Sequence, residues 1–181
     1  RWVHRLQGLL ETALGKKMVL PERKLESMEQ FLERFPEVKA VILDGTERPV
    51  QRPKDATQQK EHYSGKKKRH TRKHITGSTR TKRVLLLSKA QPGKIHDKRQ
   101  LAEAELVENI PDAVSVEGDL GFQGLQNEFV NIHLPHKKPR GKALSEEQKQ
   151  QNREFSSQRV VCEQAHAGMK RYNAGSAIYR N

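Results

Sequence analysis

Residues 38–47 read Val38-Lys39-Ala40-Val41-Ile42-Leu43-Asp44-Gly45-Thr46-Glu47, a mostly apolar run followed by an acidic turn. An apolar run of this length is typical of a strand buried on both faces of a sheet. The predicted strand covers residues 38–43 and presents Asp44 at its C-terminal end. Because open α/β sheets bind ligands at the carboxyl ends of their strands, Asp44 is the first candidate site residue.

Helices and strands alternate on either side of this strand, which indicates an α/β fold. Upstream, apolar spacing predicts one helix that ends near Gly15 and another over 21–35, which Pro36 ends. Gly77-Ser78 marks the predicted weak point between the strand-like segments at 71–79 and 82–90. Downstream we expect a polar loop over 48–70, strands at 71–79 and 82–90, a helix from Asp97, strands at 113–116 and 131–134, and a helix over 145–172.

Two of the predicted helices begin with capping signals. Ser145 is followed three residues later by Gln148, which is the spacing of a capping box. Asp97 has Gln100 at the same spacing, so N-capping is the favoured role of Asp97. A part in an active site stays open as the alternative for this carboxylate.

Composition limits the function classes. The 181 residues include 35 Lys and Arg against 22 Asp and Glu, and the net charge of +13 favours a polyanionic partner. The single cysteine excludes a disulfide framework and any multi-cysteine zinc module. No apolar run approaches the ~20 residues that span a bilayer, so no membrane partner is expected. An aromatic content of 5% argues against a stacking platform for single strands.

The positive charge is concentrated in one internal stretch. Residues 52–100 hold 16 basic and 3 acidic side chains, whereas the segments on either side are nearly neutral. A charged tail is usually terminal and structureless, but this stretch contains strand-like apolar segments. We therefore interpret it as one face of a folded unit, suited to binding a nucleic-acid backbone.

Two further carboxylates complete a candidate metal site. Asp119 follows the predicted strand at 113–116, and Glu163 lies on the final predicted helix. Three carboxylates that converge from two strands and a helix suit two Mg²⁺ ions, which prefer oxygen ligands. The alternatives without metal binding are that Asp44 and Asp119 are turn residues and that Glu163 is a solvated partner of Arg159. On the helix, Arg159, Glu163 and Lys170 fall close to one stripe.

Five sequence blocks follow one another along the chain, and together they cover roughly residues 38–173. They are VILDGTE at 41–47, HYSGKKKRH at 62–70, PGKIHDK at 92–98, GDLGF at 118–122, and RVVCE at 159–163 with Met169-Lys170. In this order they resemble the blocks of DDE transposases, which are DDE superfamily endonucleases, in the branch of bacterial insertion-sequence and eukaryotic Harbinger elements. Phe122 stands where the family usually has tyrosine.

The resemblance implies an RNase H-like mixed sheet, with its first three strands antiparallel and flanked by helices. It places the catalytic domain at 37–181. Residues 1–36 are then an N-terminal helical segment, a possible remnant of a helical DNA-binding region. Since the chain starts at Arg1, we expect a fragment that lacks the family's N-terminal helix-turn-helix.

The resemblance also implies Mg²⁺-dependent DNA cleavage and strand transfer. Asp44, Asp119 and Glu163 carry over as the metal-binding triad for two Mg²⁺ ions, for which Mn²⁺ can substitute. Water is the first nucleophile and the released 3′-OH the second. His96 and Asp97 are auxiliary candidates, because they recur as a block. The implied partner is double-stranded DNA, both at transposon ends and at target sites. The chain is expected to form a homo-oligomer when it assembles on DNA. The implied location is the bacterial cytoplasm, in association with the nucleoid.

Several basic residues are candidate DNA contacts. A nuclear-localisation-like patch or a solvated loop is the alternative for residues 66–69, but their place between two predicted strands favours phosphate contacts, which position DNA without reading its sequence. His133 and His136 are interpreted as loop or DNA-contact residues and Cys162 as a small buried side chain. The candidate DNA contacts are Lys66, Lys67, Lys68, Arg69, Arg72, Lys73, Arg159 and Lys170.

Two other functions remain open from the sequence. One is a catalytically inactive, domesticated or truncated transposase-derived protein that keeps the fold and binds DNA. The other, more remote, is an RNA-binding or ribosome-associated basic protein. Metal-dependent nicking distinguishes the enzyme from both, and competition between RNA and duplex DNA distinguishes the two binding proteins.

Overall fold

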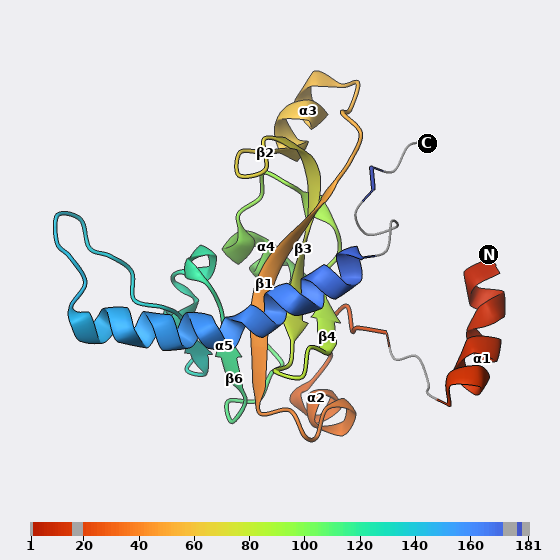
Figure 1. Ribbon diagram of the computed structural model, residues 1–181, viewed down its shortest axis with the longest axis horizontal. Coiled ribbons are helices and arrows are strands. Elements are labelled where there is room, and N and C mark those ends of the chain that lie inside the picture. Colours follow the sequence, from red (N-terminus) through yellow and green to blue (C-terminus); the bar gives the residue numbers. More distant parts are fainter. Residues whose placement is uncertain (1, 16–19, 172–176, 179–181) are drawn as a thin grey trace.

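A curled mixed sheet forms the centre of the computed structural model, which describes residues 2–15, 20–171 and 177–178 (Figure 1). Strand β3 pairs antiparallel with β1 and β4, whereas β6 pairs parallel with β1 and β7. This arrangement is consistent with the RNase H-like fold that the resemblance implies. The strands are β1 (Ala40–Pro49), β2 (Tyr63–Ser64), β3 (Arg69–Ser78), β4 (Val84–Leu87), β5 (Gln91–Pro92), β6 (Ser115–Glu117) and β7 (Ile132–His133).

Strand β1 is longer than predicted, and this moves Asp44 into the middle of the strand. Its parallel pairing with β6 stops at Ile42, opposite Glu117, but its antiparallel pairing with β3 continues to Pro49. The expectation that the strand ends at residue 43 is therefore wrong. Asp44 nevertheless lies just past the point where β6 leaves β1, so an opening beside it remains.

The second helix, α2 (Met28–Arg34), begins later than predicted. Ser27 caps it by accepting a hydrogen bond from the Gln30 amide, so residues 21–26 are not helical. Instead, Glu22 forms a bridge with β4, in which its amide donates to the Leu85 carbonyl at 2.7 Å. Leu25 is fully buried in spite of this, because the extended segment runs over the core.

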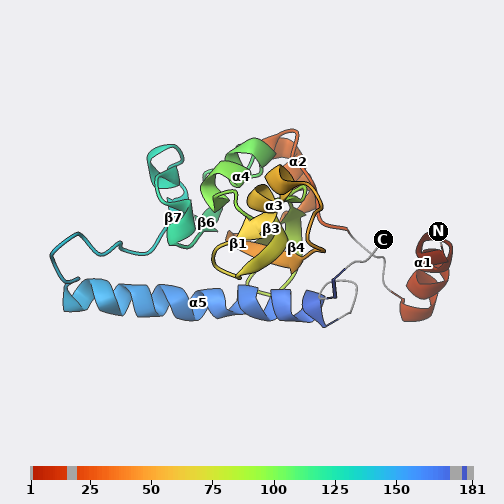
Figure 2. The ribbon, with the colours of Figure 1, turned by 90° about the horizontal axis from the view of Figure 1, so that it is seen from above.

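The first helix, α1 (Trp2–Leu14), has the predicted extent and lies apart from the sheet (Figures 1 and 2). Leu6, Leu9 and Leu10 are exposed on it. Within the predicted polar loop, the structure contains a further helix, α3 (Ala56–His62), which Asp55 caps. Because α3 has no buried residue, its sequence lacks the apolar periodicity from which a helix could be predicted.

Helix α4 (Asp97–Ala104) begins at the predicted residue but without the predicted cap. His96 occupies the N-cap position and makes no side-chain cap bond, so Asp97 is the first helical residue. The Gln100 side chain does not form the other hydrogen bond of a capping box, to the backbone amide at the start of the helix. Its buried amide donates to the Lys73 carbonyl at 2.9 Å and to Ser88 Oγ at 3.0 Å, because the β3–β4 hairpin offers it these acceptors. The capping interpretation of Asp97 is therefore wrong.

The long final helix, α5 (Glu146–Lys170), has the predicted capping box between Ser145 and Gln148. Its C-terminal half crosses one face of the sheet, opposite α2 and α4, while its N-terminal half projects beyond the sheet (Figure 2). The predicted end at Tyr172 lies outside the described residues.

One contiguous core lies under the sheet. Central strand residues Val41, Leu43 and Ile75 are fully buried in it, together with Phe31 of α2 and Leu101 of α4. Two short 3-10 helices, η1 (Leu120–Phe122) and η2 (Leu125–Asn127), close its edge with buried Phe122. No helix in the described ranges is both long and apolar enough to span a membrane.

Candidate active site

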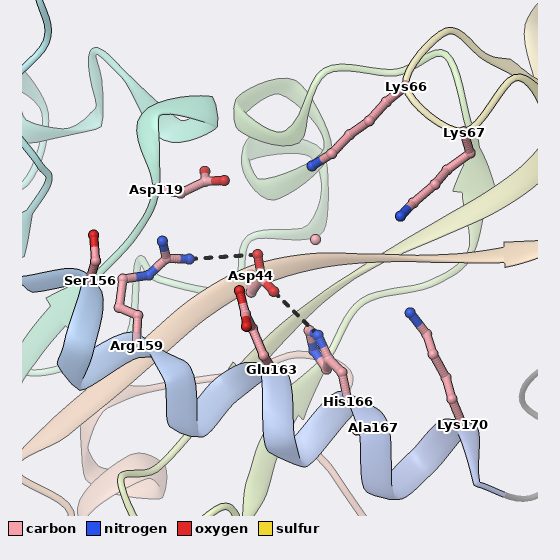
Figure 3. A pocket seen from close by; sticks show the side chains of 11 residues that line it. Asp44, Lys66, Lys67, Asp119, Ser156, Arg159, Glu163, His166, Ala167 and Lys170 are labelled. Carbon is pink, nitrogen blue, oxygen red and sulfur yellow. Dashed lines mark ion pairs between the residues drawn. The ribbon is translucent and has the colours of Figure 1, made fainter.

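The three candidate carboxylates line one cavity of about 480 Å³ between the sheet and α5 (Figure 3). Asp44 comes from β1, Asp119 from the turn after β6, and Glu163 from α5. Four basic side chains share its wall. The lining residues are Asp44, Gly45, Lys66, Lys67, Asp119, Ser156, Arg159, Glu163, His166, Ala167 and Lys170.

Asp44 is held by one cationic or basic group at each carboxylate oxygen. Arg159 Nη2 lies 3.6 Å from Oδ1, and His166 Nδ1 lies 3.2 Å from Oδ2. Burial alone would raise the pKa of Asp44, but the hydrogen bond and charge of His166, the charge of Arg159 and the Gly45 amide together lower that pKa below its ordinary value. The carboxylate is therefore ionised at neutral pH.

His166 is a buried site residue that sequence reasoning did not identify. Its Nε2 lies 2.7 Å from Thr76 Oγ1, and Thr76 in turn donates to the Asp44 backbone carbonyl at 3.2 Å. These contacts join β1, β3 and α5 around one carboxylate. The only signal in the sequence is spacing: His166 follows Glu163 by three residues, which puts both near one side of a helix.

Asp119 lines the cavity, as the metal-site prediction expects, and also stabilises a turn, as the alternative prediction expects. Its Oδ1 accepts a hydrogen bond from the Gly121 amide at 2.8 Å, which caps η1. A Cβ on Gly121 would come within 2.9 Å of both Asp119 Oδ1 and Asp97 Oδ2. Glycine at this position therefore lets the two carboxylates approach the same backbone segment.

Glu163 faces the cavity from α5 and does not pair with Arg159. Arg159 instead binds Asp44 and donates to the Leu43 carbonyl at 3.3 Å. In the part of the chain that the structure describes, no ion pair forms between Arg159 and Glu163, so the solvated-pair alternative is not observed. Glu163 points toward Asp44 (Figure 3).

The three carboxylates line the same cavity but do not form one close cluster. Among the described residues, the single group of three or more potential ligands whose atoms all lie within 4.8 Å of one another is Asp44, Cys162 and His166. Asp119 and Glu163 are not in that group.

Asp97 lies beside the site rather than in the cavity wall. A Cβ on Gly45 would come within 3.1 Å of Asp97 Oδ1, which places this carboxylate against β1. Lys73 Nζ is 2.8 Å from the same oxygen and donates to the Ile95 carbonyl. His96 is exposed and, like Asp97, is not among the lining residues.

Comparison with known proteins gives the family. A model of the family described as DDE superfamily endonuclease matches residues 43–178, which include all three carboxylates. The chain belongs to this family of DDE transposases. It is also 32% identical, over its whole length, to a protein of Microchaete diplosiphon described as a probable transposase for insertion sequence element IS702. The chain spans 62% of that protein's length. No solved structure matches significantly.

In this DDE family member, the predicted basic residues divide into two groups. Lys66 and Lys67, in the β2–β3 turn, line the cavity with Arg159 and Lys170 of α5. The others do not line it. These are Lys68, which has a positive φ of 53° in the turn, Arg69 and Arg72, which are exposed on β3, and Lys73, which is bound to Asp97.

The remaining candidates of the family member have structural roles. His136 Nε2 lies 2.7 Å from Gln151 Oε1 and its amide donates to Asn152, so the histidine fastens the preceding loop to α5. The loop interpretation is confirmed for His136 but is wrong for His133, which lies in β7. Cys162 is 1% exposed, as expected, and its Sγ accepts a hydrogen bond from Ser78 at 3.3 Å.

Proposed function

We propose that this chain is the catalytic domain of a DDE transposase, with an RNase H-like fold, that cleaves DNA and joins the released strand to a target. One observation carries the proposal: three carboxylates from separate parts of the chain line one cavity that also has four basic side chains. An acidic centre with a basic rim suits a phosphodiester, because the rim offsets the repulsion between the carboxylates and the DNA backbone.

Asp44, Asp119 and Glu163 fit Mg²⁺ as ligands. Their donor atoms are carboxylate oxygens, which Mg²⁺ and Mn²⁺ prefer, and the cavity leaves room for water and phosphate oxygens as the other ligands. Two bound ions would activate the attacking hydroxyl and stabilise the leaving oxygen. Glu163 is exposed and has no ion pair in the described segments, so its side chain can move toward the other two.

The protein's own residues prepare the site for a cation. Arg159 and His166 hold the Asp44 carboxylate in one orientation and keep it ionised. Thr76 supports this from β3 by its hydrogen bond to the Asp44 carbonyl. We assign Arg159 and His166 as positioning residues for the first carboxylate of the triad.

Lys66, Lys67, Arg159 and Lys170 bind the backbone of double-stranded DNA in this proposal. Contacts of this kind position a duplex but do not read its sequence. Recognition of transposon ends and assembly into an oligomer on DNA would belong to the whole transposase, and its place of action to the bacterial nucleoid.

The test is a nicking assay on supercoiled plasmid DNA with Mg²⁺ or Mn²⁺. Asp44→Asn, Asp119→Asn and Glu163→Gln remove charge but little volume. Each is expected to reduce nicking by more than the roughly 10–100-fold that loss of an outer-shell partner of a metal site costs. Glu147→Gln is the matched control, because Glu147 is an exposed carboxylate on the same helix outside the cavity. It should nick at the rate of the unaltered chain.

Retained nicking in a variant that combines the three substitutions would overturn the triad. If the unaltered chain shifts duplex DNA in a salt-sensitive manner but never nicks it, the chain is instead a transposase-derived DNA-binding protein. Preference for RNA over duplex DNA in competition would indicate the RNA-binding alternative.

A further inference from the structure

A second set of potential metal ligands lies against Asp44, on the side opposite Arg159. Cys162 and His166 are spaced by four residues on α5, so both side chains emerge from the same face of the helix. They are 1% and 6% exposed. The Cys162 Sγ, the His166 Nδ1 and an Asp44 carboxylate oxygen all lie within 4.8 Å of one another.

The contacts of His166 place its two ring nitrogens at two different partners. Nε2 lies 2.7 Å from Thr76 Oγ1, and the same hydroxyl lies 3.2 Å from the Asp44 carbonyl. Nδ1 faces Asp44 Oδ2 at 3.2 Å. In the tautomer with the ring proton on Nε2, Thr76 Oγ1 is the acceptor and Nδ1 offers a lone pair toward Asp44, where a cation can bind both.

We propose that Asp44, Cys162 and His166 form a binding site for a thiophilic divalent cation such as Zn²⁺, separate from the proposed magnesium triad but sharing Asp44 with it. Sulfur and imidazole ligands select zinc or cobalt, whereas Mg²⁺ favours a shell of oxygen atoms. Zn²⁺ is therefore expected to bind Asp44 together with Cys162 and His166, and Mg²⁺ to bind Asp44 together with the other carboxylates.

The local geometry suits a four-coordinate ion. Ligand bonds of about 2.0–2.2 Å to nitrogen and oxygen are compatible with the 3.2 Å between Nδ1 and Oδ2. Cys162 binds as the thiolate, and its proton is released to solvent. Three protein ligands leave the fourth position for water.

The surrounding hydrogen bonds also match those of a metal site. A metal-bound histidine usually donates its other ring N–H to a fixed acceptor, which here is Thr76 Oγ1 at 2.7 Å. Ser78 Oγ lies 3.3 Å from Cys162 Sγ, where it donates a hydrogen bond that stabilises a thiolate. Arg159 stays on Oδ1 of Asp44, away from the oxygen that faces His166.

Zinc at this site would compete with the chemistry proposed for the triad. An ion held on Oδ2 by Cys162 and His166 fixes Asp44 on the α5 side and reduces its negative charge. We therefore expect Zn²⁺ to inhibit Mg²⁺-dependent nicking. This consequence rests on the proposed function, but binding itself does not.

Binding is tested with Co²⁺ added to the complete chain under reducing conditions. We expect a sulfur-to-cobalt charge-transfer absorption, which stoichiometric Zn²⁺ abolishes by displacement. Cys162→Ser should lack this absorption. Asp119→Asn should keep it, because Asp119 belongs only to the proposed magnesium triad. Thr76→Val keeps all three ligands and should bind about 10–100-fold more weakly.

The site is ruled out if the unaltered chain gives no charge-transfer absorption, or if Cys162→Ser gives the same spectrum. Thr76→Val keeps the test decisive should Cys162→Ser fail to fold, since unchanged affinity in Thr76→Val would contradict the assigned hydrogen bonds. In the nicking assay, Cys162→Ser should keep its Mg²⁺-dependent rate and lose at least about tenfold in sensitivity to Zn²⁺. If the unaltered chain does not nick at all, the cobalt spectra still decide the metal site.

Discussion

At the scale of single residues, Asp44 is the point where the fold and the candidate site meet. The sequence identifies this carboxylate, because it directly follows the apolar run of residues 40–43. Its partners are not identifiable in that way. His166 and Thr76 lie far from Asp44 in sequence. The register between β1 and β3 sets Thr76 opposite Asp44, and the packing of α5 against the sheet brings His166 to both.

The lowered pKa of Asp44 predicts how its contribution to stability depends on pH. A carboxyl group whose folded pKa is depressed stabilises the fold above its unfolded pKa of about 3.9 and loses that effect as the pH falls through its folded pKa. In metal-free buffer, the unaltered chain should therefore be more stable to urea than Asp44→Asn near neutral pH. We expect this difference in unfolding free energy to stay constant down to about pH 5 and to shrink below about pH 4.

Asp112→Asn is the control for this comparison, because Asp112 is an exposed aspartate outside the cavity. A stability difference between Asp44→Asn and the unaltered chain that increases toward acidic pH would mean that the Asp44 charge is unfavourable in the fold. The assigned contacts with Arg159 and His166 would then be incorrect.

At the scale of elements, predictions succeeded where local signals were strong. The Ser145 capping box places the start of α5 correctly. Gly77 and Ser78, the predicted weak point between two strands, instead both lie within β3, where its register with β4 shifts. Boundaries failed where tertiary pairing overrides local pattern. Antiparallel pairing with β3 extends β1 beyond residue 43, and pairing of Glu22 with β4 delays the start of α2.

The β2–β3 turn gives a prediction of its own, because it brings Lys66 and Lys67 to the cavity. If both contact phosphates, replacing the two lysines by alanine should weaken duplex binding for all sequences alike. Each lost contact should reduce the slope of log affinity against log salt by about 0.9. Lys142→Ala is the control, since Lys142 is an exposed lysine outside the cavity. Fluorescence anisotropy with a labelled duplex at several salt concentrations measures the slopes.

An unchanged salt slope in the double lysine variant would show that the turn does not contact the DNA backbone. A slope that falls equally in Lys142→Ala would mean that the positive charge acts as a diffuse field rather than through this turn.

At the scale of the whole molecule, the net charge of +13 is organised around an acidic centre. The surplus lies in residues 52–100, between the first and second carboxylates in sequence, and two of its lysines line the cavity with all three acids. The mixed α/β sheet, the candidate triad and the family were predictable because short sequence motifs and apolar patterns indicate them. Side-chain contacts such as Lys73 with Asp97 were not, because packing across the sheet decides them.

The central claim is that Asp44, Asp119 and Glu163 form one metal site. Crystals of the chain grown with Mn²⁺ test it most directly, through the anomalous scattering of the ion. We predict a Mn²⁺ peak in the cavity within coordination distance of Asp44, with Asp119 and Glu163 both directed at it, and its loss in Asp44→Asn crystals. A cavity without Mn²⁺ at saturating concentration, or a Glu163 that points away from the occupied site, would contradict the account.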